Sequence, residues 1–129
     1  MEKSGPKRTS FTSPKNNPNF PQVLDVTCQE VLEKKESVHL IDVRRNEEYI
    51  GEYGHIPGAA LMTLDRLSST IGQLPKDETI VFVCRSGGRS AQAAAFAQSL
   101  GFQSVFNMAG GMIAWTESQF PAEDKNPHA

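Results

Sequence analysis

The sequence predicts an α/β fold in which a mostly parallel sheet is covered by helices on both faces. The first observation is the segment at residues 79–84, which is almost entirely β-branched or aromatic and follows a polar break. An apolar run without alternation is typical of a strand buried on both sides. A similar run occupies residues 38–43. Because such runs alternate with helical patterns along the chain, strand–helix–strand units are expected.

The chain divides into one domain with two polar ends. Residues 1–19 are rich in Ser, Pro, Asn and Lys and carry four basic residues against one acidic residue, which predicts a disordered basic tail. Residues 20–120 are long enough to bury a core and are expected to form the domain. Residues 121–129 are mostly polar, which predicts a flexible C-terminal tail.

The first half of the domain begins with a short extended strand expected at residues 20–24. Thr27 and Glu30 have the spacing of a capping box, so a helix is expected from there to about Lys35. Cys28 lies on the apolar stripe of this helix and is expected to face the core. After the strand at 38–43, we expect a helix at 47–50 capped by Asn46, a loop at 54–58, a strand at 59–62 and a weakly periodic helix at 64–71.

The second half of the domain is organised around residues 79–84. That strand leads through two glycines into an alanine-rich helix over residues 90–100, which Gly101 ends. A last strand is expected at 104–107, followed by a closing helix that runs through Trp115. The carboxyl end of the strand at 79–84 therefore faces the amino terminus of a helix.

Composition excludes several classes of protein. The chain has 129 residues, a net charge of -2 and ordinary hydrophobic and charged fractions, so we expect no nucleic-acid partner. No apolar run approaches the roughly 18 residues that span a bilayer, and we expect no membrane partner. The only cysteines, Cys28 and Cys84, lack metal-ligand spacing and predict neither a metal site nor a disulfide framework. A reducing, cytoplasmic location is expected.

Cys84 is the strongest candidate for a catalytic residue. It stands where a buried strand ends, and the loop after it presents backbone N–H groups and a helix amino terminus, which together favour an anion. Arg85 and Arg89 add positive charge, so the thiolate is favoured over the thiol and a nucleophile is expected. The alternative is that Cys84 is a small buried hydrophobic residue.

Three blocks of sequence, in order, carry a resemblance to a known family. They are Ile41-Asp42-Val43-Arg44 with Glu48-Tyr49 and Gly54-His55-Ile56-Pro57-Gly58-Ala59, then Cys84-Arg85-Ser86-Gly87-Gly88-Arg89-Ser90, then Asn107-Met108-Ala109-Gly110-Gly111-Met112-Ile113-Ala114-Trp115. Over residues 20–119 the sequence resembles the rhodanese homology domain. The resemblance implies a three-layer fold with a five-stranded parallel sheet, and a sulfurtransferase that works through a cysteine persulfide.

Loop length separates two chemistries within this resemblance. The spacing from Cys84 to Arg89 is C-x4-R, which matches sulfur-transferring rhodaneses. The related dual-specificity phosphatases have one more residue, C-x5-R, in a loop that holds a phosphate tetrahedron. The resemblance therefore implies that the Cys84 thiolate takes the outer sulfur of thiosulfate or a similar anionic donor. A thiol, cyanide or a protein acceptor then removes that sulfur, and no cofactor is required.

The remaining loop residues have predicted roles of their own. Arg85 is expected to point outward and attract the donor, and Arg89 to brace the loop by pairing with Glu48, as the family counterpart suggests. Gly87 and Gly88 are expected to provide positive φ or close backbone approach. Ser86 and Ser90 either contact the sulfur or cap the helix.

Outside the loop, Asp42 with Arg44, and His55, are further candidate residues, and alternative functions stay open. Asp42 and Arg44 end a neighbouring strand, where they either support the site or form a structural ion pair. His55 is expected to be structural, fixing the loop at 54–58. The alternative functions are a rhodanese-like binding or regulatory module and phosphatase or arsenate reductase chemistry. The oligomeric state, monomer or homodimer, is not predicted.

Overall fold

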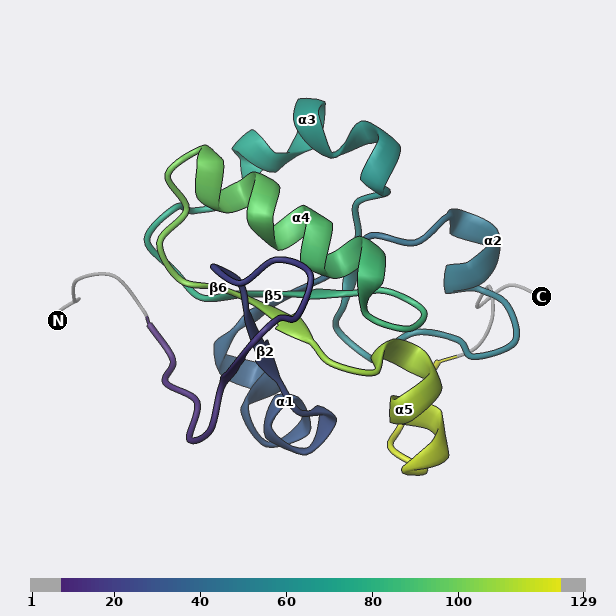
Figure 1. The fold of residues 1–129 in the computed structure, drawn as a ribbon. Helices are drawn as coiled ribbons and strands as arrows, with labels where there is room; N and C mark the ends of the chain where they lie inside the picture. The colour runs from purple at the N-terminus through teal and green to yellow at the C-terminus, as the bar shows by residue number, and fades with distance from the viewer. Residues whose placement is uncertain (1–7, 124–129) are drawn as a thin grey trace, which may run out of the picture.

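The fold is a six-stranded sheet between two layers of helices (Figure 1). It comes from a computed structural model that describes residues 8–123. The strands lie in the order β1-β2-β6-β5-β3-β4, and all neighbours are parallel except β1 and β2. The strands are β1 (Lys15–Asn16), β2 (Leu24–Val26), β3 (His39–Asp42), β4 (Ala60–Leu61), β5 (Ile80–Val83) and β6 (Val105–Met108).

The helices cover the two faces of this sheet. Helices α3 and α4 lie over one face, and α1 and α5 lie over the other, while α2 stands beyond the end of β3 (Figure 1). The helices are α1 (Cys28–Lys34), α2 (Asn46–Tyr49), α3 (Leu67–Thr70), α4 (Gly88–Ser99) and α5 (Gly111–Glu117). Short 3₁₀ turns are η1 (Lys35–Ser37), η2 (Leu64–Arg66) and η3 (Ile71–Gln73).

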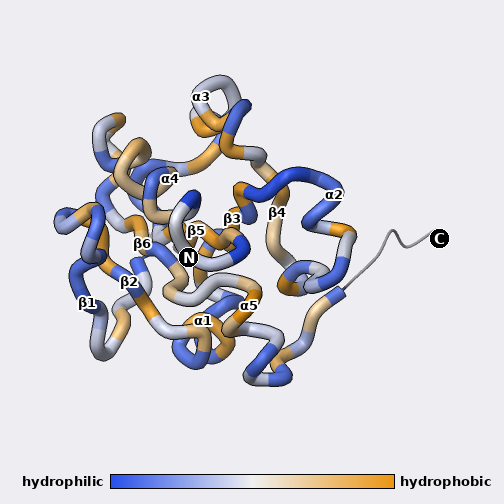
Figure 2. Tube along the Cα trace, turned by 45° about the vertical axis from the view of Figure 1, so that its right-hand side comes forward, coloured by the Kyte–Doolittle hydropathy of each residue, from blue (hydrophilic) through white to orange (hydrophobic). Residues whose placement is uncertain are grey.

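Strand β5 is the centre of both cores. Its side chains alternate, so Ile80 and Phe82 pack beneath α3 and α4, whereas Val81 and Val83 pack against α1 and α5. All four are fully buried. Figure 2 shows this as a hydrophobic interior through β3, β4 and β5 with a hydrophilic α2 outside it. The predicted strand buried on both faces is confirmed, and it fixes the position of the residue that follows, Cys84.

The sheet has six strands, where five were expected. The additional strand is β1, which pairs antiparallel with β2 through Lys15 opposite Asp25 and Asn16 opposite Leu24. It lies within the stretch that the composition assigned to a disordered tail. Backbone pairing needs no apolar side chain, so a polar segment of two residues gives no periodic pattern from which such a strand can be predicted.

The segment before β1 also packs on the domain, which corrects the expected tail over residues 8–19. Phe11 is 8% exposed and lies in the core beside Phe106, with 4.7 Å between ring centroids. The Thr12 N–H donates to Glu30 Oε2 at 2.7 Å. Burial of one aromatic ring, joined to backbone pairing, anchors a stretch of otherwise polar composition. The remainder of the expected tails, residues 1–7 and 124–129, lies outside the described residues.

Most other expected elements are present with shifted ends. Thr27 caps α1 and accepts from the Glu30 N–H, as predicted, but Glu30 turns to Thr12 rather than back to Thr27. The expected strand at 20–24 begins only at Leu24, because the Val23 N–H closes a turn onto the Phe20 carbonyl at 2.8 Å. Arg45, and not Asn46, occupies the N-cap position of α2. The helix expected at 64–71 is divided among η2, α3 and η3.

Replacing Phe11 tests whether the first described segment stabilises the domain. Phe11→Ala removes a buried ring and should lower the free energy of unfolding by about 3 kcal/mol. Ser13→Ala, at an exposed position in the same segment, should change it by less than about 0.5 kcal/mol. Urea unfolding of both variants measures the difference. Equal stability of the two would show that the segment does not contribute to the core.

Candidate active site

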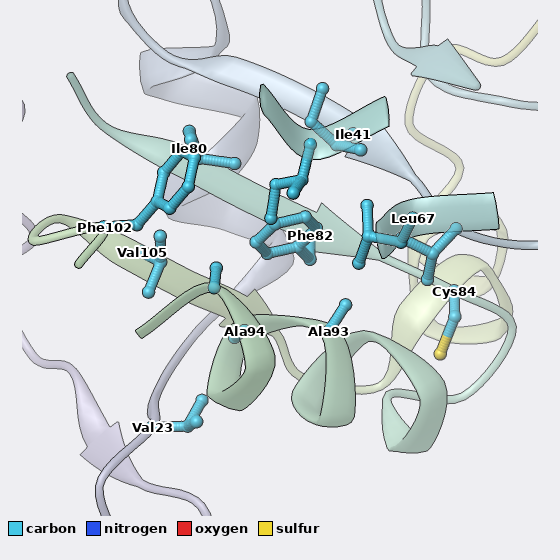
Figure 3. Packing of buried hydrophobic residues seen from close by; sticks show 13 residues of the cluster. Val23, Ile41, Leu67, Ile80, Phe82, Cys84, Ala93, Ala94, Phe102 and Val105 are labelled. Atoms are coloured by element: carbon cyan, nitrogen blue, oxygen red, sulfur yellow. The ribbon is translucent and has the colours of Figure 1, made fainter. Parts of the chain in front are cut away.

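Cys84 lies directly after β5 with its sulfur under the following loop. The side chain is 1% exposed, and Figure 3 shows its sulfur turned toward the first turn of α4. The Gly87 N–H donates to Sγ at 3.1 Å, and Ser90 Oγ lies 3.2 Å from Sγ. Of the loop amides expected to surround the sulfur, Gly87 is the one that donates to it. The sulfur therefore faces one backbone N–H donor and the Ser90 hydroxyl, although it is nearly closed to solvent.

The two loop glycines differ in what they contribute. Gly87 has φ 110°, which a residue with a side chain adopts only at a cost, so a glycine is required there. Gly88 has no positive φ, and a Cβ at its position would meet nothing within 4 Å. The expectation that both glycines were needed for φ or close approach is therefore wrong for Gly88. Because Gly88 has helical backbone angles and open space around it, residues with a side chain could also occupy that position.

Gly111 holds the loop from behind, a role that the sequence analysis did not assign. The Met112 N–H donates to the Cys84 carbonyl at 2.9 Å, and the Ile113 N–H donates to the Arg85 carbonyl at 3.0 Å. A Cβ on Gly111 would lie 2.4 Å from the Arg85 oxygen and 2.5 Å from the Cys84 oxygen. The first turn of α5 therefore approaches the loop so closely that only glycine fits. In the sequence, the adjacent glycines Gly110 and Gly111 are the feature that could have indicated this contact.

Arg89 and Glu48 form the predicted pair. Two parallel hydrogen bonds of 2.7 and 2.8 Å join Arg89 NH1 and NH2 to the carboxylate oxygens. The hydrogen bond from Arg89 lowers the pKa of Glu48 from its usual 4.5 to about 2, and Glu48 in turn raises the pKa of Arg89. The pair ties α4 to α2 across the mouth of the loop, which is the bracing expected of Arg89.

Asp42 and Arg44 form an ion pair that is almost fully buried, with each side chain 1% exposed. Arg44 binds both carboxylate oxygens of Asp42, at 2.9 and 2.8 Å. It also donates to the carbonyls of Glu48 and Gly54, at 3.2 and 2.6 Å. The guanidinium thus fastens the connection between β3 and β4 from inside. Of the two alternatives, support of the site or a structural ion pair, the geometry supports the structural ion pair.

Arg85 and Ser86 are exposed on the outer side of the loop. The Arg85 guanidinium lies 5.6 Å from the centre of the Tyr53 ring, a cation–π arrangement. Arg85 and Tyr53 line a pocket of about 160 Å³ with Arg44, Glu47, Glu48 and Glu52. Arg85 therefore points outward as expected, into a pocket that also carries acidic groups.

Ser90 belongs to a buried chain of polar side chains that the sequence analysis did not find. Its hydroxyl, which lies beside the sulfur, also donates to Asn107 Oδ1. Asn107 Nδ2 donates to Asp25 Oδ1 at 2.8 Å, and Asn17 Nδ2 donates to the same oxygen at 3.0 Å. Ser90 lies within α4 and does not cap it. Asp25 and Asn107 are 82 positions apart in sequence, so no local pattern connects them.

His55 and Cys28 have the structural roles that were predicted. The His55 ring stacks on Tyr49 at 3.7 Å, and its Nδ1 lies 2.8 Å from the Tyr49 carbonyl oxygen. Cys28, the first residue of α1, is buried in the core, and burial raises its thiol pKa to about 11. Neither residue contacts the sulfur of Cys84 among the hydrogen bonds of the described residues.

Two broader features bear on the chemistry. Among residues 8–123, no three His, Cys, Asp or Glu side chains gather in a way that would hold a metal ion. Over the same residues, every helix is too short or too polar to cross a membrane.

Similarity to known proteins agrees with this site. The family model described as Rhodanese-like domain matches residues 27–118. The chain belongs to the rhodanese-like family. The matched region includes the rhodanese loop from Cys84 to Ser90 and both partners of the Arg89–Glu48 pair. It begins after Asp25 and Asn17, which lie outside the family match.

Several relatives of this chain are named as sulfurtransferases. A sulfurtransferase of Allochromatium vinosum is 37% identical over 90 residues, covering 70% of this chain and 82% of the relative. The thiosulfate sulfurtransferase GlpE of Shewanella oneidensis is 33% identical over 87 residues, covering 67% and 84%. The solved structure of the human single domain sulfurtransferase TSTD1 has TM-score 0.62 and 32% identity, covering 72% and 95%. These likenesses support an enzyme of the sulfurtransferase class.

Some relatives are longer than this chain. The chain spans 55% of the length of the Bacillus subtilis protein YrkF, to which it is 33% identical over 104 residues. The rhodanese unit therefore occurs both by itself and as part of larger proteins. The similarity extends to the unit and not to the remaining length of such relatives.

Replacing Gly111 tests the contact behind the loop. Gly111→Ala places a Cβ on two carbonyl oxygens at a residue with φ 58°, so it should cost about 3 kcal/mol or more of folding free energy. Gly72→Ala is the matched control, because a Cβ there meets nothing within 4 Å. It should be neutral or slightly stabilising. Thermal unfolding compares the two, and a stable, unperturbed Gly111→Ala protein would contradict the contact.

Acid titration tests the pairing of Glu48 with Arg89. The folded-state pKa of about 2 lies below the usual 4.5, so the pair's contribution is complete above pH 4.5 and is lost as the pH falls toward 2. Glu48→Gln should lower stability at neutral pH by about 1 to 2 kcal/mol, since Arg89 is partly solvated, and should flatten this acid dependence. Glu47→Gln, at an exposed position, is the control. An unchanged acid profile in Glu48→Gln would rule out the pairing.

Proposed function

We propose that the protein transfers sulfane sulfur through a persulfide on Cys84. The Cys84 thiolate attacks the outer sulfur of thiosulfate or a related anionic donor, and the sulfur–sulfur bond of the donor breaks so that sulfite leaves with the electron pair. The outer sulfur remains on Cys84 as Cys84-S-S⁻. A thiol, cyanide or protein acceptor then takes this sulfur. The bond between the two sulfur atoms breaks, and its electron pair returns to Cys84 Sγ. Two half-reactions on one enzyme imply ping-pong kinetics.

The observation that carries this proposal is the placement of Cys84 Sγ under a C-x4-R loop, 3.1 Å from the Gly87 N–H. A fixed backbone donor stabilises negative charge on sulfur without reorganisation during the reaction. Because Cys84 is only 1% exposed, the closed loop suits delivery of one sulfur atom and disfavours a phosphate tetrahedron. Phosphatase and arsenate reductase chemistry are therefore disfavoured.

Further residues have proposed roles in the same reaction. Arg85, exposed beside the loop, attracts the anionic donor, while Ser86 and Gly88 form the outer rim of the loop. Arg89 and Glu48 position the loop. The catalytic unit is proposed to comprise residues 20–120 together with the packed segment at 8–19, and to work in the cytoplasm without a cofactor, a nucleic acid or a membrane.

A rhodanese-like binding or regulatory module is the second candidate function. The observation in its favour is the burial of Cys84, because a sulfur that is 1% exposed receives a donor only if the donor reaches beneath the loop. In that alternative, the fold presents a surface to a partner and Cys84 stays unmodified. The two functions differ in whether Cys84 accepts sulfur.

Sulfur loading distinguishes these functions. Wild-type protein treated with thiosulfate should gain the mass of one sulfur atom on the peptide that contains Cys84, and cyanide should remove it as thiocyanate. Cys84→Ser should gain nothing, whereas Cys28→Ser should load normally because its thiol lies elsewhere in the core. Mass spectrometry of the peptides measures the loading. If the wild type gains no sulfur under conditions that load a known rhodanese, the binding module is favoured, and Cys84-dependent hydrolysis of an aryl phosphate would indicate a phosphatase.

A further inference from the structure

The chain of polar side chains behind Cys84 has a defined direction. Asp25 Oδ1 receives two amide groups, from Asn107 at 2.8 Å and from Asn17 at 3.0 Å. A carboxylate oxygen only accepts hydrogen bonds, so both amides must turn their NH₂ groups toward it. This fixes the side chain of Asn107, which is 1% exposed, with its oxygen facing Ser90.

Ser90 has one hydroxyl proton for two neighbours. Its oxygen lies beside Asn107 Oδ1 and 3.2 Å from Cys84 Sγ. Because the Asn107 oxygen only accepts, it takes the Ser90 proton, and the lone pairs of Ser90 are left facing the sulfur. In that arrangement the Cys84 thiol can donate its proton to Ser90 Oγ, whereas the Cys84 thiolate faces the lone pairs of Ser90 Oγ and is repelled by them. For Ser90 to donate to a thiolate, its proton has to leave Asn107, and two acceptor oxygens then face each other at a buried site.

We propose that Asp25 and Asn107 are positioning residues that direct the Ser90 proton away from Cys84 and thereby make its inner sulfur less readily an anion. The three residues come from β2, β6 and α4, and the line Asp25–Asn107–Ser90 ends on the reacting atom. The outer end borders a pocket of about 220 Å³ that is also lined by Ser86 and Gly87. We call the line Asp25–Asn107–Ser90 the relay. It links β2, which lies just before the family match, to the active loop.

The relay has a consequence for turnover that rests on the proposed function. When an acceptor thiolate attacks the outer sulfur of Cys84-S-S⁻, the bond between the two sulfurs breaks and its electron pair passes to Cys84 Sγ. An arrangement that opposes an anion on Sγ slows this step, while the persulfide keeps its charge on the outer sulfur. The relay thus favours holding sulfur on Cys84 over releasing it.

Other charges near Cys84 have to be kept separate from this effect. They are Arg85 in the loop, Arg89 on α4, Glu48 on α2, Asp42 at the end of β3 and Arg44 after it. All five stay in place in every variant below. Asp25 also carries a charge, so its removal acts through space as well as through the relay. Only the part that passes through Ser90 tests the proposal.

The test is the pH dependence of Cys84 alkylation by iodoacetamide, with each cysteine peptide resolved by mass spectrometry. Asp25→Asn lets the Asn107 amide turn round, so Ser90 is free to donate to the sulfur. The midpoint for Cys84 should fall by about one pH unit, the effect of one hydrogen bond to a charged group. In a Ser90→Ala background the same substitution should shift the midpoint much less. Glu33→Gln, which removes a carboxylate at an exposed position on α1, should leave it unchanged.

Two results would overturn the proposal. An equal shift on Asp25→Asn with and without Ser90 would show that the charge acts through space alone, and an unchanged midpoint would show that the relay has no effect. If Asp25→Asn does not fold, Asn107→Leu, which removes the acceptor of the Ser90 proton, should lower the midpoint in the same Ser90-dependent way. Alkylation needs no sulfur donor, so this result is independent of whether Cys84 accepts sulfur from thiosulfate.

Discussion

The active loop depends on a contact between backbones that leaves no room for a side chain. The first turn of α5 donates two N–H groups to the carbonyls of Cys84 and Arg85, and Gly111 lies against both oxygens. With these carbonyls directed toward α5, the chain turns back through Gly87, whose N–H reaches the sulfur. The orientation of the loop is thus set by its contact with the first turn of α5. Rigid support of this kind is what a preorganised anion site requires.

The charges around the site divide between support and reaction. The Asp42–Arg44 pair is buried, with two hydrogen bonds between its members and two from Arg44 to the backbone carbonyls of Glu48 and Gly54, so it contributes little free charge to the loop. Arg89 is largely compensated by Glu48. Arg85 is the loop arginine that remains exposed to solvent. The field on the sulfur is therefore a balance in which the Gly87 amide and the helix terminus favour an anion and the arrangement of Ser90 opposes one.

Sequence reasoning reached the features that are local or that occupy a buried strand. The run at 79–84 predicted β5 and the position of Cys84, and loop composition predicted the positive φ of Gly87. The Arg89–Glu48 pair was implied by the family resemblance. Sequence reasoning did not reach features in which distant polar residues meet, because an Asp25–Asn107 hydrogen bond leaves no periodic pattern. For the same reason it assigned Phe11 and the β1 residues to a tail. Gly88 shows the opposite error, since a glycine in a motif is not always there for its backbone.

The partnership of β1, β2 and β6 has a bearing on how small a working version of this protein can be. A recombinant fragment cut at residues 27 and 118, the limits of the family match, would lose β1 and β2 and leave the backbone of β6 unpaired on the side that faces β2. An uncovered strand of this kind is open to pairing with other molecules. Such a fragment would keep every residue of the rhodanese motif. It would nevertheless expose an edge of β6 that can aggregate, and it would lack Asn17 and Asp25 of the polar chain behind Cys84.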